Sequence, residues 1–205
     1  MDRTRRALFA LPLALALAPA VLPGAAQAQA LGLAEISAYL NQLQTAQGGF
    51  TQVNADGTIS TGTIYIKRPG RVRFEYDPPE DSLVMAGGGS VAIFDRRSNE
   101  NPERYPLNQT PLSIILAANV DFTRANMVTG HTSDGSTTTV TAQDPDHPDY
   151  GSIQMVFSAN PVELRQWVVT DNAGTQTTVI LNNLATGMQI AEGLFNIRAE
   201  TSNWN

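Results

Sequence analysis

Alternating apolar and polar positions run along much of the chain after residue 50 and predict a protein built mainly of β-strands. The alternation is clear in TIYIKRPGRVRFEY, residues 63–76, which predicts two short strands joined at Pro69-Gly70. The even-numbered apolar positions of this stretch are Ile64, Ile66, Val72, Phe74 and Tyr76. Arg68 shares their parity, so a permanent charge stands in a row of residues that favour burial. Either Arg68 is buried with hydrogen-bond partners, such as carbonyls at a helix end, or it reaches water at the rim.

Further strands are predicted by the same alternation, with Gly, Pro, Asn and Asp at the turns between them. Beyond the opening pair, the predicted strand segments are SLVMA (82–86), SVAIFD (90–95), 126–131, 137–142, 151–158, 162–170 and 176–184. Residues 96–106 are polar and contain prolines, so they predict a loop. Sequential hairpins then give about nine to eleven short strands in an antiparallel sheet.

A helix is predicted near the start of the mature chain. The apolar positions there recur at helical spacing: Leu33, Ile36, Leu40 and Leu43. They predict one amphipathic helix over residues 33–47, which Gly48-Gly49 would end.

A second, short helix is predicted in the apolar segment TPLSIILAANV, residues 110–120, with Thr110 as its N-cap and Pro111 at its first position. A large sheet must curl around something or pack against another layer, and the two helices are the natural cover. The sequence therefore predicts a mainly β protein with a curled antiparallel sheet and helices. Its interior is either filled by side chains or holds an apolar ligand.

The N-terminus predicts export. Three arginines precede an apolar run and then the small residues AAQAQA, as in a secretory signal peptide. We expect residues 1–30 to be the signal peptide, with cleavage after Ala28 or Ala30, and residues 31–205 to form a single periplasmic domain. Arg5-Arg6 is a partial match to a twin-arginine signal, so the export route stays open, with the ordinary route favoured. No later segment is apolar for long enough to span a bilayer.

Charge and cysteine content narrow the possible partners. Removing residues 1–30 changes 13 basic and 19 acidic residues to 10 and 18, so the net charge changes from −6 to −8. An acidic chain of this kind argues against binding to nucleic acid or to anionic lipid head groups. The sequence has no cysteine, which excludes a disulfide, a thiolate metal site and a cysteine nucleophile.

Catalytic motifs are scarce. The sequence contains no G-x-S-x-G, H-E-x-x-H, P-loop or G-x-G-x-x-G pattern. Residues 144–151, DPDHPDYG, offer three aspartates and His147 as metal ligands, but the prolines break the calcium-loop pattern and no glutamate closes it. We therefore expect a plain acidic loop, and a protein without metal, cofactor or enzymatic activity. We also expect His131 to be structural and the carboxylates of residues 77–81 to belong to a solvated turn.

Four segments, in order, resemble the outer-membrane lipoprotein carrier family, LolA. They are GFTQ at 49–52, GTIYIKRPGRVRFEYDPPE at 62–80, GGGSVAIFD at 87–95 and PLSIIL at 111–116. The strand pair KRPGRVRFEY with its preceding glycine is the specific part. The sequence departs from the family at Val72, where an aromatic residue is often found, and the C-terminal GLFNIRAETSNWN matches only loosely.

The resemblance implies a periplasmic chaperone with an unclosed β-barrel of about 11 strands, covered by an α-helical lid. Proteins of this family receive lipoproteins from an ATP-driven releasing complex in the inner membrane, shelter their acyl chains and pass them to an outer-membrane acceptor. The resemblance also implies that Arg68 bonds the lid, which contains Leu112, Ile115 and Leu116, and keeps the cavity closed until lipid displaces those bonds. Together with strand parity, it implies a cavity lined by Ile64, Ile66, Val72, Phe74, Met85, Ile93, Met155, Phe157, Trp167 and Val169.

Alternatives remain open at this stage. LolA-like folds also occur in modules that sense lipids or lipoproteins and regulate the envelope response, but these usually carry a further domain. A membrane-anchored acceptor with a similar fold would need a lipidated cysteine, which the sequence lacks. We expect a monomer, and the sequence specifies neither the lipoproteins carried nor the role of the C-terminal segment.

Overall fold

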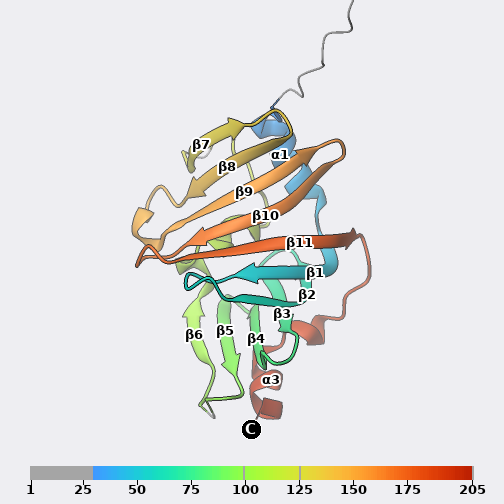
Figure 1. The fold of residues 1–205 in the computed structure, drawn as a ribbon, viewed down its shortest axis with the longest axis vertical. Helices are drawn as coiled ribbons and strands as arrows, with labels where there is room; N and C mark the ends of the chain where they lie inside the picture. The colour runs from blue at the N-terminus through green and yellow to red at the C-terminus, as the bar shows by residue number, and fades with distance from the viewer. Residues whose placement is uncertain (1–29, 99, 125, 205) are drawn as a thin grey trace, which may run out of the picture.

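A single eleven-stranded antiparallel sheet forms most of the protein (Figure 1). The computed structural model describes residues 30–98, 100–124 and 126–204, so the predicted signal peptide lies almost wholly outside the described residues. The strands are β1 (Thr45–Val53), β2 (Ile59–Lys67), β3 (Arg71–Tyr76), β4 (Ser82–Gly87), β5 (Ser90–Asp95), β6 (Glu103–Pro106), β7 (Val128–Ser133), β8 (Thr137–Gln143), β9 (Ser152–Ala159), β10 (Val162–Thr170) and β11 (Gln176–Thr186). The helices are α1 (Leu33–Gln42), α2 (Leu112–Ile115) and α3 (Ile197–Trp204), with 3₁₀ turns η1 (Leu107–Gln109), η2 (Pro148–Tyr150) and η3 (Glu192–Phe195).

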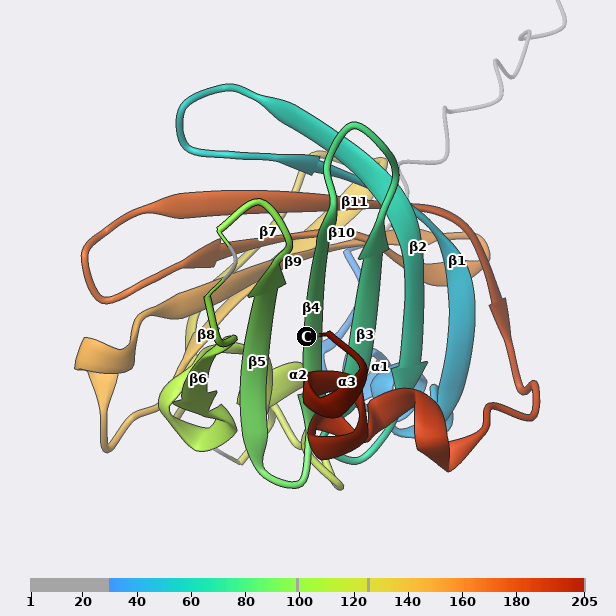
Figure 2. The ribbon, with the colours of Figure 1, turned by 90° about the horizontal axis from the view of Figure 1, so that it is seen from below.

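The sheet curls but does not close. Its strand order is β6-β5-β4-β3-β2-β1-β11-β10-β9-β8-β7, so β6 and β7 are the two free edges. Every pairing is antiparallel, and the one non-sequential pairing joins β1 to β11. Figure 2 shows the strands curving around a common interior. The predicted unclosed barrel with few helices is confirmed.

Helix α1 is shorter than predicted, because it ends at Gln42 and β1 begins at Thr45. The prediction that Gly48-Gly49 ends a helix is wrong, since both glycines lie within β1, beside a bulge opposite β11. A Cβ atom at Gly48 would lie 2.8 Å from the Asn182 carbonyl oxygen. The glycine therefore allows a close approach of two strands rather than stopping a helix.

Two further elements differ from the prediction. The segment predicted as a loop contains the edge strand β6, and the C-terminal segment forms a third helix, α3. Helix α2 has only four residues, and its N-cap is Pro111 rather than Thr110, whose hydroxyl donates to the Leu107 carbonyl oxygen instead. None of the helices in the described part of the chain is long and apolar enough to cross a membrane.

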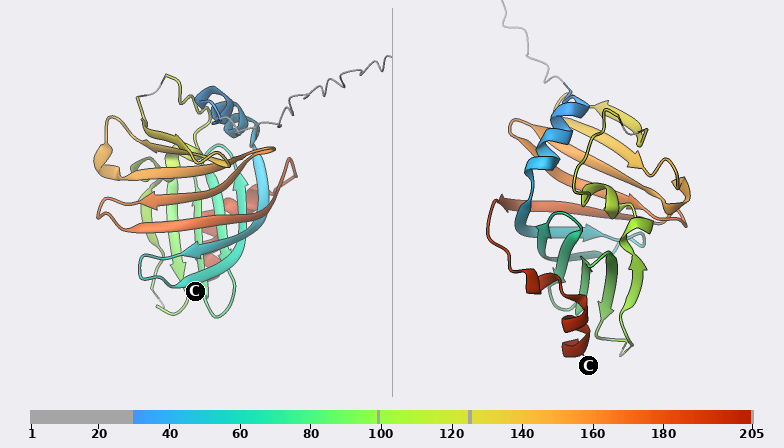
Figure 3. Two further views of the ribbon diagram at one scale, coloured as in Figure 1. Left: turned by 45° about the horizontal axis from the view of Figure 1, so that its top comes forward. Right: turned by 180° about the vertical axis from the view of Figure 1, so that it is seen from behind.

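The helices cover opposite faces of the sheet. Figure 3 shows α1 and α2 together on the rear side, whereas Figure 2 shows α3 outside strands β3 and β4. The main core lies on the inner face, where side chains from β1–β5 and β8–β11 meet those of α1 and α2. A second, smaller core lies on the outer face and consists of Leu83, Met85, Ala92, Phe94 and Ile197, with Trp204 packed against it.

The outer core is closed by charged side chains as well as apolar ones. Arg73 is 9% exposed and is paired with Glu75 at 2.6 Å and with Glu200 of α3 at 2.9 Å. The Arg96 guanidinium lies 4.3 Å from the centre of the Trp204 ring. These contacts attach α3 to β3–β5, so both faces of this part of the sheet are covered.

Gly62 provides a test of the strand packing. A Cβ atom there would overlap the Glu75 carbonyl oxygen of the neighbouring strand and would lie 2.7 Å from a ring carbon of Phe50. We predict that Gly62→Ala lowers the free energy of unfolding by about 1–3 kcal/mol in chemical denaturation. Gly49→Ala is the control, because its Cβ would have no neighbour closer than 3.6 Å. Equal stability of the two variants would contradict this account of the packing.

Candidate functional site

The concave face of the sheet gathers most of the residues predicted to line a cavity. The buried members of the predicted set in the main core are Ile64, Ile66, Val72, Phe74, Met155, Phe157 and Trp167. Val169 is half-buried against this core, and Ile93 is 37% exposed. Strand parity from the sequence therefore placed these side chains on a common inner face.

Met85 was assigned to the wrong face. It lies in the outer core beneath α3, while its neighbour Val84 lies on the inner face and packs against the main core. The error has a physical reason. Residues 83–86 are apolar on both sides of the strand because α3 covers the outer face, so alternation could not distinguish inside from outside.

The lid, defined here as residues 107–122, lies across the concave interior. Its buried side chains include Ile114, Ile115 and Leu116, whereas Leu112 is half-buried against the core. Ile114 was absent from the predicted lid residues. Helix α2 has four residues and is too short to show a regular apolar stripe. Helical spacing therefore could not tell which of its side chains face the core.

Arg68 is buried beneath the lid. The residue follows the last position of β2 and is only 4% exposed. Its Nη2 group donates a hydrogen bond to the Ala117 carbonyl oxygen of the lid at 2.5 Å. The Nε and Nη1 groups are buried without a hydrogen-bond partner among the described residues. Burial lowers the pKa of Arg68 below its ordinary value, because the charged form loses hydration.

A backbone hydrogen bond lies next to the Arg68 contact. The Gly70 N–H donates to the Leu116 carbonyl oxygen at 2.8 Å. Two successive lid carbonyls, those of Leu116 and Ala117, are therefore bonded by the short turn between β2 and β3. This turn is the Pro69-Gly70 turn within the segment that most resembles the LolA family.

Helix α1 bonds the far end of the lid. The Asn41 side chain donates to the Val120 carbonyl oxygen at 2.8 Å and accepts from the Val120 N–H at 2.9 Å. The Ser37 hydroxyl accepts from the Phe122 N–H at 3.0 Å. Sequence analysis missed both residues. Two short polar side chains four positions apart on one side of an amphipathic helix were the signal that could have revealed them.

Two spaces of very different size adjoin the lid. The closed space, lined by Arg68, Leu43, Ile66, Val72, Leu112, Ile115, Leu116 and Trp167, has a volume of about 10 Å³. The open chamber is lined by residues of β3–β6 on one side, residues of β10 and β11 on the other and residues 109–112 of the lid, and it has a volume of about 630 Å³. Ligand pockets typically enclose about 300–1,000 Å³, so the open chamber has the size of a binding site and the closed space does not.

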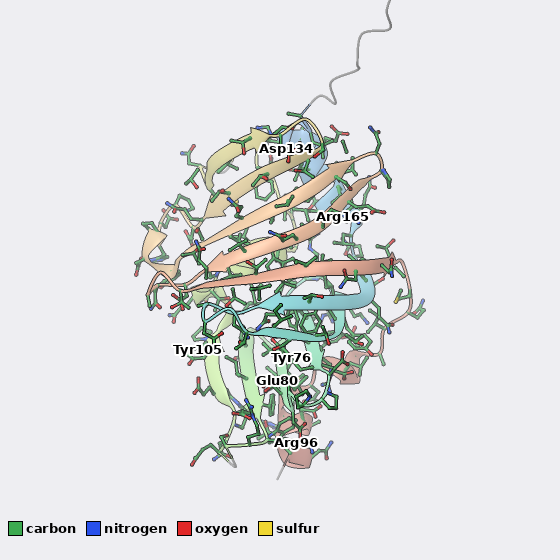
Figure 4. All side chains as sticks on the ribbon, in the orientation of Figure 1. Tyr76, Glu80, Arg96, Tyr105, Asp134 and Arg165 are labelled. Atoms are coloured by element: carbon green, nitrogen blue, oxygen red, sulfur yellow. The ribbon has the colours of Figure 1, made fainter. Side chains whose placement is uncertain are left out.

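The open chamber has an apolar floor and a polar rim. The floor is formed by Phe74, Val84, Val91, Ile93, Leu112, Trp167, Val169 and Val179. Phe74 meets Trp167 edge to face, with ring centres 6.3 Å apart. Tyr76 and Tyr105, both labelled in Figure 4, belong to the rim. Burial raises the pKa of Tyr76 to about 12, so its hydroxyl remains neutral and donates to Gln52 at 2.7 Å.

Other polar residues considered from the sequence have structural contacts. His131 bonds the Leu31 carbonyl oxygen at 2.9 Å, and His147 stacks on Tyr150 with ring centres 4.6 Å apart. Glu80 pairs with Arg97 at 3.0 Å. Within the described ranges, no group of three or more His, Asp or Glu side chains is placed to hold a metal ion.

An unclosed antiparallel barrel with an apolar interior and a bonded lid defines a class of proteins that can enclose apolar ligands. Comparison with known families is more specific: residues 41–198 match the model of the outer membrane lipoprotein carrier protein LolA. The chain belongs to the LolA family.

Relatives extend over most of the chain. An outer-membrane lipoprotein carrier protein of Coxiella burnetii is 23% identical over 186 residues, covering 86% of this chain and 87% of the relative. One from Leptothrix cholodnii is 33% identical over 133 residues, covering 60% and 62%. The putative outer membrane lipoprotein-sorting protein domain of Vibrio parahaemolyticus has a similar fold, with a TM-score of 0.50 at 7% identity over 82% of this chain and 97% of that one.

The Asn41 contact with the lid can be tested by hydrogen exchange. We predict that Asn41→Ala speeds exchange of the Val120 amide by about tenfold, because loss of the side chain leaves the N–H and carbonyl of Val120 without these partners. Asn182→Ala is the control, since Asn182 lies on exposed β11 and bonds Thr51 rather than the lid. Unchanged exchange of the lid amides in Asn41→Ala would show that this contact does not fasten the lid.

Proposed function

We propose that this protein is a periplasmic chaperone that shelters the acyl chains of lipoproteins and carries them to the outer membrane. The observation that carries the proposal is the buried Arg68 bonded to the lid above an apolar interior. Family membership and relatives named as outer-membrane lipoprotein carriers support the same role.

The contacts of Arg68 suit a carrier that must also release its cargo. Each methylene buried from water contributes about 0.8 kcal/mol, so an acyl chain bound in a permanently open cavity would be strongly retained. A closed empty state that competes with lipid reduces this retention. The lid side chains Ile114, Ile115 and Leu116 occupy part of the apolar interior in the closed state, and the bonds from Arg68 and Gly70 favour that state.

Arg68 also limits how strongly the lid is held closed. A buried guanidinium loses hydration, and among the described residues just one of its nitrogens, Nη2, has a hydrogen-bond partner. Unpaired buried donors are unfavourable, so the closed state retains an energetic penalty. The hydrogen bonds that close the lid are therefore weak enough for acyl chains to displace the lid.

The proposal extends to location and partners. The protein would act in the periplasm as a monomer, receive lipoproteins from an ATP-driven releasing complex in the inner membrane and deliver them to an outer-membrane acceptor. Residues 31–205 would form one carrier domain after removal of the signal peptide. An acidic net charge suits a carrier that does not bind lipid head groups non-specifically.

Replacement of Arg68 tests the proposed release mechanism. We predict that Arg68→Leu still accepts lipoprotein from inner-membrane vesicles but transfers it to the outer membrane about tenfold more slowly. The substitution removes the hydrogen bond from Arg68 to the lid, which favours the closed state. We expect the closed state to lose about 1.4 kcal/mol relative to the state with bound acyl chains, which corresponds to a factor of ten. The measurement is the rate at which labelled lipoprotein leaves the purified complex for outer membranes.

Arg165→Leu is the matched control, because Arg165 lies on β10 (Figure 4), is more than half exposed and pairs with Glu163 rather than with the lid. It should transfer lipoprotein at the normal rate. Normal transfer by Arg68→Leu would contradict the proposed role of Arg68. Purification of the wild-type protein with free phospholipid or a signalling protein, and without lipoprotein, would instead favour a sensing module.

A further inference from the structure

The open chamber is separated from the closed space by side chains common to both. Leu112 and Trp167 line the closed space on one side and the open chamber on the other. The two spaces therefore meet at a wall made of one lid residue and one residue of β10. Arg68 lines only the closed space.

Access to the open chamber does not require the lid bonds to break. The residues that bond the lid, Ser37, Asn41, Arg68 and Gly70, are all absent from its lining. The chamber's volume of about 630 Å³ is present while these bonds are formed. An apolar chain can thus be buried against Phe74, Ile93 and Val169 in the closed state.

The charges around the chamber favour a chain whose polar end carries no negative charge. Among the residues that the structure describes, Asp149 and Asp171 are the charged residues of the lining, and no lysine or arginine lines the chamber. Both aspartates lie with Tyr150 and Asn172 in the loops that border β9–β11. A carboxylate or phosphate at the end of a bound chain would be repelled, whereas an ester or amide would meet hydroxyl and amide groups at the rim.

We propose that the open chamber is an initial binding site for a single alkyl chain with an uncharged, ester- or amide-linked polar end, accessible while the lid is closed. The proposal rests on the carrier function and adds an order of events to it. One acyl chain binds in the chamber first, and displacement of the Leu112–Trp167 wall then joins the chamber to the space beneath the lid.

A brominated fatty acid and its methyl ester provide matched probes, because they differ in the charge of one end and bromine quenches tryptophan fluorescence on contact. Trp204 lies in the outer core, so Trp204→Phe leaves Trp167 as the reporter. We expect quenching of Trp167 to show that the ester binds with at least about fivefold higher affinity than the fatty acid at neutral pH. Equal affinities for the two probes, or no quenching by the ester, would overturn the proposal.

Three further variants in the Trp204→Phe background locate the bound chain. Ile93→Glu should weaken ester binding at least tenfold, and its folding is checked by circular dichroism because Ile93 is 37% exposed. Asp149→Asn combined with Asp171→Asn should strengthen fatty-acid binding about fivefold and leave ester binding unchanged. Arg165→Leu, at a position that is more than half exposed and absent from the chamber lining, should change ester affinity less than twofold.

The outcomes separate this proposal from the carrier function. Unchanged ester binding in Ile93→Glu, or a large change in Arg165→Leu, would place the chain outside the open chamber and overturn the proposal. Lipoprotein transfer is measured with the same preparation of wild-type protein. Normal transfer without ester binding would refute the initial site and leave the carrier function intact, whereas failure of transfer with ester binding intact would refute the carrier function alone.

Discussion

A buried positive charge is the constraint on which the arrangement of the lid depends. Arg68 enters an apolar interior, where its guanidinium must find an acceptor or lose much of its hydration energy. The acceptor is the Ala117 carbonyl oxygen, two residues after the end of α2. The position of the charge therefore fixes the position of the lid. The Gly70 bond to Leu116 and the Asn41 bonds to Val120 align the same segment on either side of that contact.

The rest of the fold supports this arrangement by giving the sheet two different faces. On the concave face, the core is formed by apolar side chains of the strands, of α1 and of the lid. On the convex face, strands β3–β5 are fastened to α3 by an apolar core and by the ion pairs of Arg73. Strand β3 thus carries Val72 and Phe74 toward the inner core and Arg73 toward α3, so one strand joins the two packed layers.

The sequence was informative where one face of a strand is apolar and the other polar. Alternation along residues 63–76 placed Ile64, Ile66 and Phe74 on the inner face, and the parity of Arg68 identified the unusual charge. Alternation failed at Met85, since α3 covers the outer face there and both sides of the strand are apolar. Helix α3 itself was missed because it lacks a long apolar stripe and depends on tertiary contacts such as Arg96 with Trp204. The interior is divided into a closed space and an open chamber where Leu112 and Trp167 line both, and periodicity does not encode this arrangement of residues far apart in the sequence.

The amide of Gly70 reports most directly on whether cargo and lid closure exclude one another. In the empty protein this N–H is bonded to the Leu116 carbonyl oxygen. Its hydrogen exchange can be followed by nuclear magnetic resonance in the empty protein and in a purified complex with lipoprotein. The account predicts slow exchange in the empty protein and exchange at least about tenfold faster in the complex, because acyl chains displace the lid. Equal protection of Gly70 in both states would contradict the central claim that the lid must leave the Arg68 turn before acyl chains occupy the space beneath it.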